Sequence, residues 1–467
     1  SCSSKPGPAP SPVDLSRDLA GKVKVDAPFA HLRQLQEIAN ANKGSRADGT
    51  AGYDASVDYV VKLLSEKGFD VSTPEASRLA TQQPGTQTLI VGERKFTIDQ
   101  ASLLVQTPAG GLSVRAEHPA KPAGCAAGDY AGTAVKGAIA VTDDQACSIV
   151  DKQNAALANG AVALLVMSGK SVRPGLFTPG YYRQLTVPVG VIGTDADAAV
   201  RRTNASVRLT LESKAVLTKS RNVLAQTKTG SARNVVLVGA HLDSAEASPG
   251  INDDGSGVAA VLETALQLGS SPSVTNAVRF CFWAAAEQGV GGSTSYLSGL
   301  SNDQLDDIAL YLNFDQLASA NAGYFTYDGD QSGQASVDVP AERVPAGSAG
   351  VERTLAGYLN LAGRRPADLP LGGTADYFPF LTAGVPIGGV TTWATGKKSP
   401  VQARLWDGAV GQPFDPYYHL PGDTLEHVNR DALAVTGPAV AFAVGTYALS
   451  TDGVNGVPPR DGRHRLR

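Results

Sequence analysis

The order of secondary structure after residue 221 most constrains the fold of this chain. Apolar runs such as NVVLVGA (234–240) and AVRFCFW (277–283) alternate with helical runs such as GSGVAAVLETALQLGS (255–270). Strands that alternate with helices indicate an α/β domain with a mainly parallel sheet. We therefore predict an α/β fold class, a mainly parallel mixed sheet flanked by helices.

Two further regions differ in character. Residues 14–71 place apolar residues at helical spacing and carry no strands, so we assign them to the same domain as the later sheet. Residues 86–220 hold short β-branched runs between Gly, Pro and Asp turns, which indicate a β-rich insert. The predicted discontinuous domain thus covers 14–85 and 221–455.

The two ends of the chain are polar. Residues 1–13 (SCSSKPGPAPSPV) form a Pro/Ser run that predicts a flexible tether, and 456–467 a basic tail that we expect to be disordered. Met167 is the only methionine, which predicts a processed chain. The Ser1–Cys2 pair resembles the end of a bacterial lipobox, so Cys2 is a candidate for lipid attachment; an accidental chain boundary is the alternative.

Charge and hydropathy exclude two classes of function. The chain has 40 Lys+Arg against 44 Asp+Glu and a formal net charge of −4, so it lacks the basic excess that binds nucleic acid. No run of about 18 consecutive apolar residues occurs, which predicts that no segment spans a membrane.

The cysteines allow a prediction of whether the protein resides in an oxidising or a reducing compartment. In an exported protein we expect Cys125 and Cys147 to form a disulfide. Cys281 lies in an apolar strand and is expected to be a buried free thiol. The alternative is a cytosolic protein in which all of these thiols are reduced.

Several predicted strands run into a residue that can bind a metal. NVVLVGA leads into His241 and IALYLNF into Asp315, while Glu287 follows AVRFCFW after a short gap. Ligands collect outside the carboxyl ends of the strands in open α/β sheets, so these side chains are expected to meet. Taken alone, each of these residues could be a helix cap or one member of an ordinary hydrogen-bonded pair. The order in which the motifs follow one another along the chain favours a metal site.

Three neighbouring motifs extend this set. In H-L-D, Asp243 lies on the same side of the strand as His241 and can orient its imidazole. GINDDGSG (250–257) places Asp253 just before a helix, and YYHLPGDT supplies His419. Nitrogen and oxygen ligands without thiolates suit zinc.

The ordered set H-x-D, N-D-D-G-S-G, W-x-x-x-E-x-G, N-x-D and Y-H-x-x-x-D-T resembles the bacterial two-zinc aminopeptidases, over roughly the first 75 residues and 220–450. The resemblance implies a zinc exopeptidase fold that holds two Zn²⁺ per chain. Asp253 would bridge the ions and its following peptide bond would be cis. The implied metal ligands are His241, Asp253, Glu287, Asp315 and His419.

The 86–220 insert resembles a protease-associated domain, and the match includes Cys125 and Cys147. Such a domain implies a role in access or substrate selection, with a passive lid as the alternative.

One position departs from the family pattern. Active relatives carry W-x-A-E-E-x-G, in which the first Glu is the general base, and here Ala286 occupies that position before Glu287. General-base catalysis is worth about 10²–10⁴-fold, so the chain as written is expected to be nearly inactive. The retained ligands favour a deliberate Glu→Ala change over a natural pseudoenzyme that binds zinc and peptides without cleaving them.

The resemblance also implies the substrate and its contacts. The expected reaction removes the first residue from peptides with a free N-terminus. Tyr418 would stabilise the oxyanion, and the loop at 373–386 makes Asp376, Tyr377 and Phe378 candidates for substrate binding, with loop packing as the alternative. We expect an exported protein, secreted or lipid-anchored at the outer face of the cell membrane.

Overall fold

The computed structural model describes residues 12–98, 100–169, 176–177, 179–336 and 338–466. It separates into two compact units, one formed by residues up to Ser77 together with those from Lys219, and one formed by Arg78–Thr218. The chain crosses the boundary in a two-stranded ribbon of β2 (Glu75–Gln83) and β11 (Lys214–Arg221).

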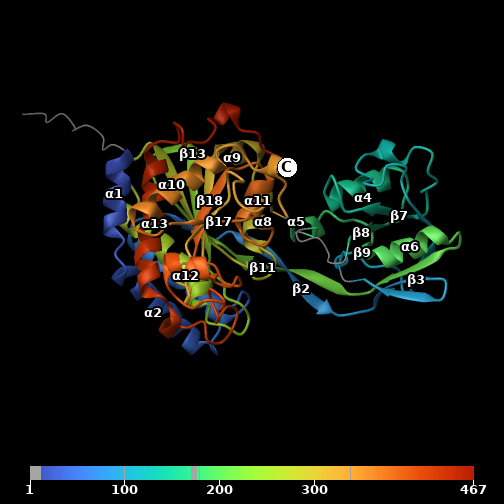
Figure 1. The fold of residues 1–467 in the computed structure, drawn as a ribbon, viewed down its shortest axis with the longest axis horizontal. Coiled ribbons are helices and arrows are strands. Elements are labelled where there is room, and N and C mark those ends of the chain that lie inside the picture. The colour runs from blue at the N-terminus through green and yellow to red at the C-terminus, as the bar shows by residue number, and fades with distance from the viewer. Residues whose placement is uncertain (1–11, 99, 170–175, 178, 337, 467) are drawn as a thin grey trace, which may run out of the picture. The chain divides into compact units, whose positions relative to one another are not determined.

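The larger unit is built on an eight-stranded sheet (Figure 1). Its four central strands are parallel and the edges add antiparallel pairs, which confirms the predicted mainly parallel mixed sheet. In spatial order the strands are β1 (Val71–Ser72), β12 (Val223–Gln226), β14 (Asn276–Trp283), β13 (Ser231–His241), β15 (Ile308–Asp315), β18 (Ile387–Thr391), β16 (Phe325–Tyr327) and β17 (Ala367–Leu369).

Helices from both ends of the sequence cover this sheet. Every residue of β15 is buried, as expected for a parallel strand with both faces covered. α1 packs against α13, and α2 and α3 against α7, so the N-terminal helices belong to this unit (Figure 1). The helices are α1 (Pro12–Lys22), α2 (Asp26–Ala41), α3 (Ala51–Glu66), α7 (Gly257–Leu268), α8 (Gly291–Ser298), α9 (Asn302–Asp307), α10 (Ser348–Leu361), α11 (Tyr377–Thr382), α12 (Pro400–Trp406) and α13 (Arg430–Leu449), with short helical turns η2 (Ile251–Ser256), η3 (Ala341–Arg343), η4 (Leu425–His427) and η5 (Arg460–Gly462).

Among the described residues one helix, α13, is long and apolar enough to cross a membrane. Of its most apolar window, 72% is buried inside the protein, where α13 contacts α1, α7 and α10. These contacts identify α13 as a core helix.

The smaller unit holds two four-stranded sheets, ordered β4-β3-β10-β5 and β6-β7-β8-β9. Cys125 and Cys147 form a disulfide with Cα atoms 6.0 Å apart, as predicted, and in the larger unit Cys281 is a buried free thiol. The strands are β3 (Gln87–Val91), β4 (Arg94–Thr97), β5 (Leu112–Val114), β6 (Ala116–Glu117), β7 (Ile139–Asp143), β8 (Ala163–Met167), β9 (Val189–Ile192) and β10 (Val207–Leu211), with helices η1 (Ala127–Tyr130), α4 (Ile149–Ala158), α5 (Pro179–Tyr182) and α6 (Thr194–Arg202).

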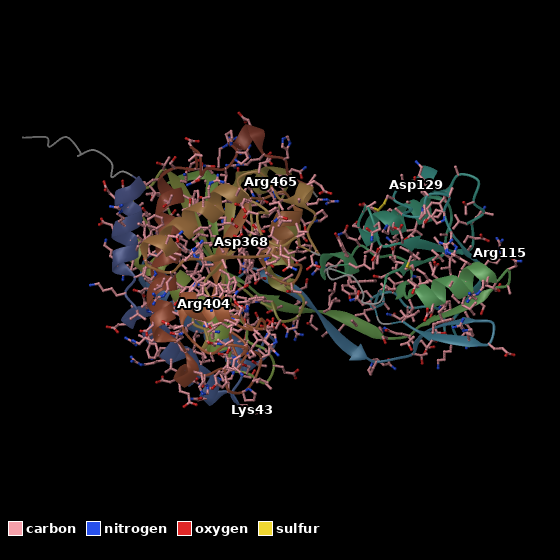
Figure 2. The ribbon with its side chains drawn as sticks, viewed as in Figure 1. Lys43, Arg115, Asp129, Asp368, Arg404 and Arg465 are labelled. Carbon is pink, nitrogen blue, oxygen red and sulfur yellow. A yellow bond between two sulfur atoms is a disulfide. The ribbon has the colours of Figure 1, made fainter. Side chains whose placement is uncertain are left out.

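Both expectations for the chain ends need correction. The tether was predicted to reach residue 13, but α1 already begins at Pro12; Cys2 and the rest of 1–11 lie outside the described residues. The tail predicted to be disordered at 456–467 is packed through residue 466. Arg465 donates to the carbonyls of Gly384 and Ile308 at 2.7 and 2.6 Å (Figure 2). Backbone carbonyls near α11 and at the start of β15 thus hold the C-terminal segment against the larger unit, although its polar sequence predicted exposure to solvent.

Arg463 generates a prediction about stability. It is 8% exposed and donates to the side chain of Asn234 and to the carbonyls of Asp306 and Arg233. We expect Arg463→Ala to lower the free energy of unfolding by about 2 kcal/mol, because these partly buried hydrogen bonds lose their charged donor. Urea unfolding measures the change. Arg404→Ala, at an exposed position on α12 (Figure 2), should change it by less than about 0.5 kcal/mol; equal effects would contradict the assignment.

Candidate metal centre

The carboxyl ends of the central strands form one edge of the sheet. β13 ends at His241, which lies beside Trp283 at the end of β14, and the neighbouring strand β15 ends at Asp315. This register brings side chains from three segments of the sequence to one place.

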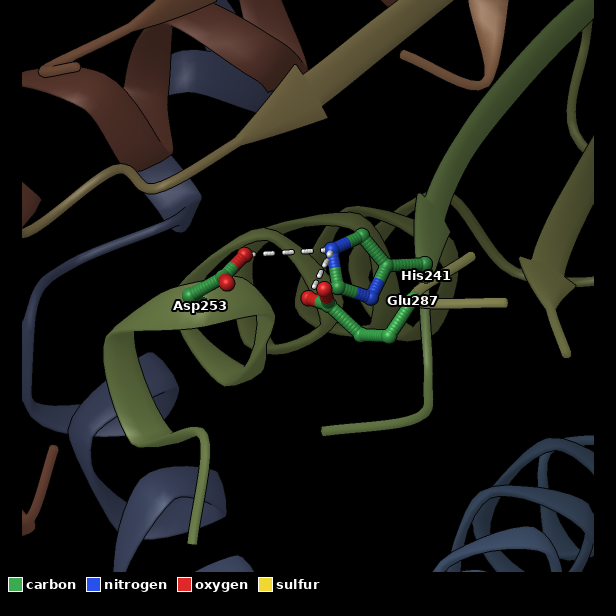
Figure 3. A group of neighbouring side chains, drawn as sticks. All are labelled: His241, Asp253 and Glu287. Carbon is green, nitrogen blue, oxygen red and sulfur yellow. Dashed lines mark hydrogen bonds and ion pairs between the residues drawn. The ribbon is translucent and has the colours of Figure 1, made fainter. Parts of the chain in front are cut away.

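Four of the predicted ligands form a compact group. The Nε2 atom of His241 lies 3.1 Å from Asp253 Oδ1 and 3.8 Å from Glu287 Oε1, and Figure 3 shows both carboxylates facing this one nitrogen. On the other side, His419 Nε2 lies 2.9 Å from Asp253 Oδ2 and 2.8 Å from Glu287 Oε2. Asp253 therefore faces both histidines.

The fifth predicted ligand, Asp315, lies next to this group. Ligand atoms of His241, Asp254 and Asp315 all lie within 4.8 Å of one another. Asp315 Oδ2 accepts a hydrogen bond from Asn313 at 3.0 Å, while Oδ1 is buried and accepts none from the described residues. The structure thus brings all five predicted ligands together.

The donor set fits divalent cations. Asp315 Oδ1 and Asp253 Oδ2 are buried carboxylate oxygens without a hydrogen bond of normal geometry, which is costly unless a cation satisfies them. The group offers imidazole nitrogen and carboxylate oxygen and no thiolate, as zinc accepts.

Asp253 and its neighbour Asp254 are placed differently, and the peptide bond between them is cis. Asp254 Oδ2 accepts the N–H of His241 at 3.1 Å, and Oδ1 accepts those of Gln316 and Gly257 at 3.0 and 3.2 Å. Because backbone donors already occupy both oxygens of Asp254, Asp253 is the better placed ligand of the two.

Asp243 contacts more than the imidazole that it was predicted to orient. His241 Nδ1 lies 2.9 Å from the backbone carbonyl of Asp243 and 3.3 Å from its carboxylate. That carboxylate accepts the N–H groups of Ala286 and Glu287, both at 3.1 Å. Asp243 therefore also holds the loop that follows β14.

Burial and charge shift the titration of the candidate ligands. Burial lowers the pKa of His419, but hydrogen bonds to Asp253 and Glu287 outweigh it and raise the pKa to about 10. Burial and the charge of Asp253 raise the pKa of Glu287 to about 8. Burial opposes the ionisation of Asp253, yet its bonds to both histidines hold its pKa below the ordinary value.

Tyr418 and position 286 border this group. The Tyr418 ring stacks on His419 with centroids 3.7 Å apart, and burial raises the pKa of Tyr418 well above its usual value, so its hydroxyl keeps its proton. Ala286 precedes Glu287 and offers only a methyl group.

The three candidates for substrate binding differ in their burial and hydrogen bonding. Asp376 is 1% exposed; its Oδ1 accepts from Ser293 at 2.7 Å, its Oδ2 is buried without a hydrogen bond, and burial raises its pKa to about 7. Tyr377 is buried, its ring 4.7 Å from that of Tyr327 and its hydroxyl accepting the Gly372 N–H. Phe378 packs partly buried against the same apolar cluster. Of the three, Asp376 alone has a buried polar atom without a hydrogen bond to any of the described residues.

Sequence reasoning missed Arg46 and Gln316. Arg46 is fully buried and donates to the carbonyls of Leu242, Pro249 and Gly250 at 2.7–2.9 Å. Burial lowers its pKa to about 10, opposed by the charge of Asp243. Gln316 donates from Nε2 to Asp253 Oδ1 at 2.9 Å. Gln316 directly follows the N-x-D motif, and Arg46 lies within the first 75 residues that resemble the family, but only the folded backbone reveals the partners of either residue.

The class that the fold defines is an α/β metallopeptidase with an inserted β-rich unit, and the comparisons specify its family. The model of peptidase family M28 matches residues 222–444, and that of the PA domain matches 109–200. A probable lipoprotein aminopeptidase, LpqL, of Mycobacterium tuberculosis is 46% identical over 461 residues, 98% of this chain and 91% of the relative. The chain therefore belongs to peptidase family M28 with an inserted PA domain, as the motifs predicted.

Other similar proteins also carry the name aminopeptidase. An aminopeptidase of Pseudomonas aeruginosa is 35% identical over 442 residues (90% of this chain, 80% of the relative). A probable leucine aminopeptidase 2 of Aspergillus fumigatus is 34% identical over 448 residues (92% and 84%). The aminopeptidase structure from Aneurinibacillus sp. strain AM-1 shares the fold, with a TM-score of 0.58 at 22% identity over 95% of this chain and 98% of that one.

Metal uptake by this group should release protons. The raised pKa of His419 means that the metal-free imidazole carries a proton at neutral pH, and a metal binds only its neutral form. We expect zinc to displace protons, so that apparent zinc affinity rises between about pH 6 and pH 8. Calorimetry in buffers of different ionisation enthalpy counts the protons. His419→Gln should release fewer, and an affinity independent of pH would contradict this picture.

Proposed function

We propose that this chain is a two-zinc aminopeptidase whose general base is replaced by Ala286. The observation that carries the proposal is the convergence of five side chains with nitrogen or oxygen ligand atoms, His241, Asp253, Glu287, Asp315 and His419. Among the described residues, one buried oxygen of Asp253 and one of Asp315 have no hydrogen bond of normal geometry. Family membership and the names of the relatives support the same activity.

The ligands divide between two ions around Asp253. His241 and Asp315, whose ligand atoms lie within 4.8 Å, would hold one ion. Glu287 and His419, 2.8 Å apart, would hold the other, and Asp253 faces both pairs. Bound zinc supplies Lewis acidity toward the scissile carbonyl and lowers the pKa of the attacking water.

Side chains of the protein would bind the substrate and transfer protons. Tyr418 keeps its hydroxyl proton and can donate to the oxyanion that forms at the carbonyl. Asp315 would lie near the substrate's amino group. A glutamate at position 286 would accept the proton of the water and pass it to the leaving amine, a step that the Ala286 methyl group cannot perform.

We further propose an exported protein that acts on peptides with a free N-terminus, with a preference for apolar first residues. The Cys125–Cys147 disulfide suits an oxidising compartment. The 46% identical relative carries the name lipoprotein aminopeptidase, which supports a lipid anchor at Cys2. The name leucine aminopeptidase of more distant relatives supports the apolar preference.

A second function rests on Ala286 itself. If the natural gene encodes alanine at this position, the zinc-loaded chain would be a peptide-binding protein. The gene-encoded residue separates this case from a deliberate Glu→Ala change. The zinc-loaded chain would then bind peptides with a free N-terminus more tightly than N-acetylated ones, as calorimetry can measure; equal affinities would reject it.

Restoring the base tests the proposed activity. We expect Ala286→Glu, loaded with zinc, to hydrolyse leucine p-nitroanilide about 10²–10⁴-fold faster than the unaltered chain, because the proton acceptor returns. Ala286→Gln has a side chain of the same length without a basic group and should stay near the unaltered rate. Continued inactivity of zinc-loaded Ala286→Glu would overturn the proposal, and rapid turnover by the unaltered chain would show that position 286 is not the base.

The restored enzyme also allows a test of Tyr418. We expect Tyr418→Phe in the Ala286→Glu background to lower kcat by about 10²–10³-fold, the usual cost of one oxyanion donor. The affinity for zinc should change little, because the Tyr418 ring that stacks on His419 is retained. An unchanged kcat would exclude Tyr418 from the reaction.

A further inference from the structure

Asp423 makes an unusual set of contacts with the turn that carries Asp253. Its carboxylate accepts the N–H of Asn252 through Oδ1 at 2.8 Å and the N–H of Asp253 through Oδ2 at 3.1 Å. Its backbone carbonyl accepts the N–H of Ile251 at 3.2 Å. One residue, 2% exposed, thus receives three consecutive backbone donors.

Those donors have no intrahelical partners to replace Asp423. They belong to the first residues of η2, and the first N–H groups of any helix lack an acceptor within it. Backbone dihedrals at Asp253 and Asp254 are non-helical, so this turn is not a regular helix start. The conformation that presents the Asp253 side chain therefore depends on acceptors from elsewhere.

Asp423 itself lies in the loop that carries His419. That loop is folded on itself: the N–H of Tyr418 reaches the carbonyl of Asp415 at 3.3 Å, and that of Asp423 reaches Leu420 at 3.1 Å. A second tie joins the same two segments, because Asn252 Nδ2 donates to Asp415 Oδ2 at 3.0 Å. The two loops are thereby held in one register.

We infer that Asp423 is a positioning residue that locks the Asp253 turn to the His419 loop and so assembles these two ligands before metal binds. Asp423 is not among the ligands, and it acts through backbone N–H groups. The inference rests on the proposed metal site, in which Asp253 and His419 share an ion.

The chain contains a matched control. Asp129 likewise accepts two consecutive backbone donors, the N–H of Cys125 at 2.9 Å and that of Ala126 at 3.2 Å. It belongs to the smaller unit, Arg78–Thr218, which carries none of the five candidate ligands. Asp129→Asn makes the same chemical change without touching a ligand-bearing segment.

The experiment compares zinc affinities, measured by competition with a chromogenic chelator, in the full-length chain. In Asp423→Asn the amide keeps one acceptor oxygen and turns its NH₂ toward a backbone donor. We expect its zinc affinity to fall by about 10- to 100-fold, as for other groups that orient ligands. Asp129→Asn should change affinity by less than about twofold, because its unit carries none of the candidate ligands.

The outcomes are distinct. Wild-type affinity in Asp423→Asn, or an equal loss in both variants, would overturn the role of Asp423. Failure of the unaltered chain to take up zinc would instead overturn the proposed function. If Asp423→Asn does not fold, hydrogen exchange of the unaltered, zinc-free chain decides: the amides of 251–253 should be protected before zinc is added, and rapid exchange there would refute the inference.

Discussion

The gathering of buried carboxylates at the carboxyl edge of the sheet is the constraint on which the rest of this site depends. Asp243, Asp253, Asp254 and Asp315 are all less than 10% exposed, and charges so buried are unfavourable unless they are satisfied. Backbone N–H groups donate to Asp243 and Asp254, and the charge of the fully buried Arg46 interacts with both carboxylates. What remains unsatisfied points to the cations that the ligands would hold.

Sequence reasoning predicted the fold and the meeting of His241 with Asp315 for one physical reason, whereas the full set of five ligands was implied by the family resemblance and stays a prediction. Parallel strands end at a common edge, so a polar residue after each strand, such as His241 or Asp315, must meet the others there. A side chain that acts by binding backbone groups cannot be assigned its partners from a sequence pattern. Arg46 binds carbonyls and Asp423 binds N–H groups, and every residue offers both, so their partners emerge only from the folded chain.

The same reasoning explains what was misjudged. The composition of the C-terminal segment predicts a solvated basic tail. Arg463 and Arg465 nevertheless donate to backbone carbonyls, which cannot be predicted from the pattern of side chains. Tyr377, by contrast, is buried in a loop whose aromatic residues could line a pocket or fill a core, and its part in substrate binding stays a prediction. At position 286 the contact to Asp243 is made by the backbone N–H, so it survives whichever side chain is present. The neighbouring N–H of Glu287 reaches Asp243 in the same way, so the backbone of this loop is held whatever residue stands at position 286.

The path of the chain through the two units has a consequence for its synthesis. Helix α1 at the start of the described chain packs against α13 near its end, whereas Arg78–Thr218 forms a compact unit from one continuous segment. As the chain emerges during synthesis or export, the inserted unit can fold from its own residues, while the early helices must wait for the last one. Their apolar faces therefore stay exposed until α13 has emerged, and in this interval the chain is most open to aggregation.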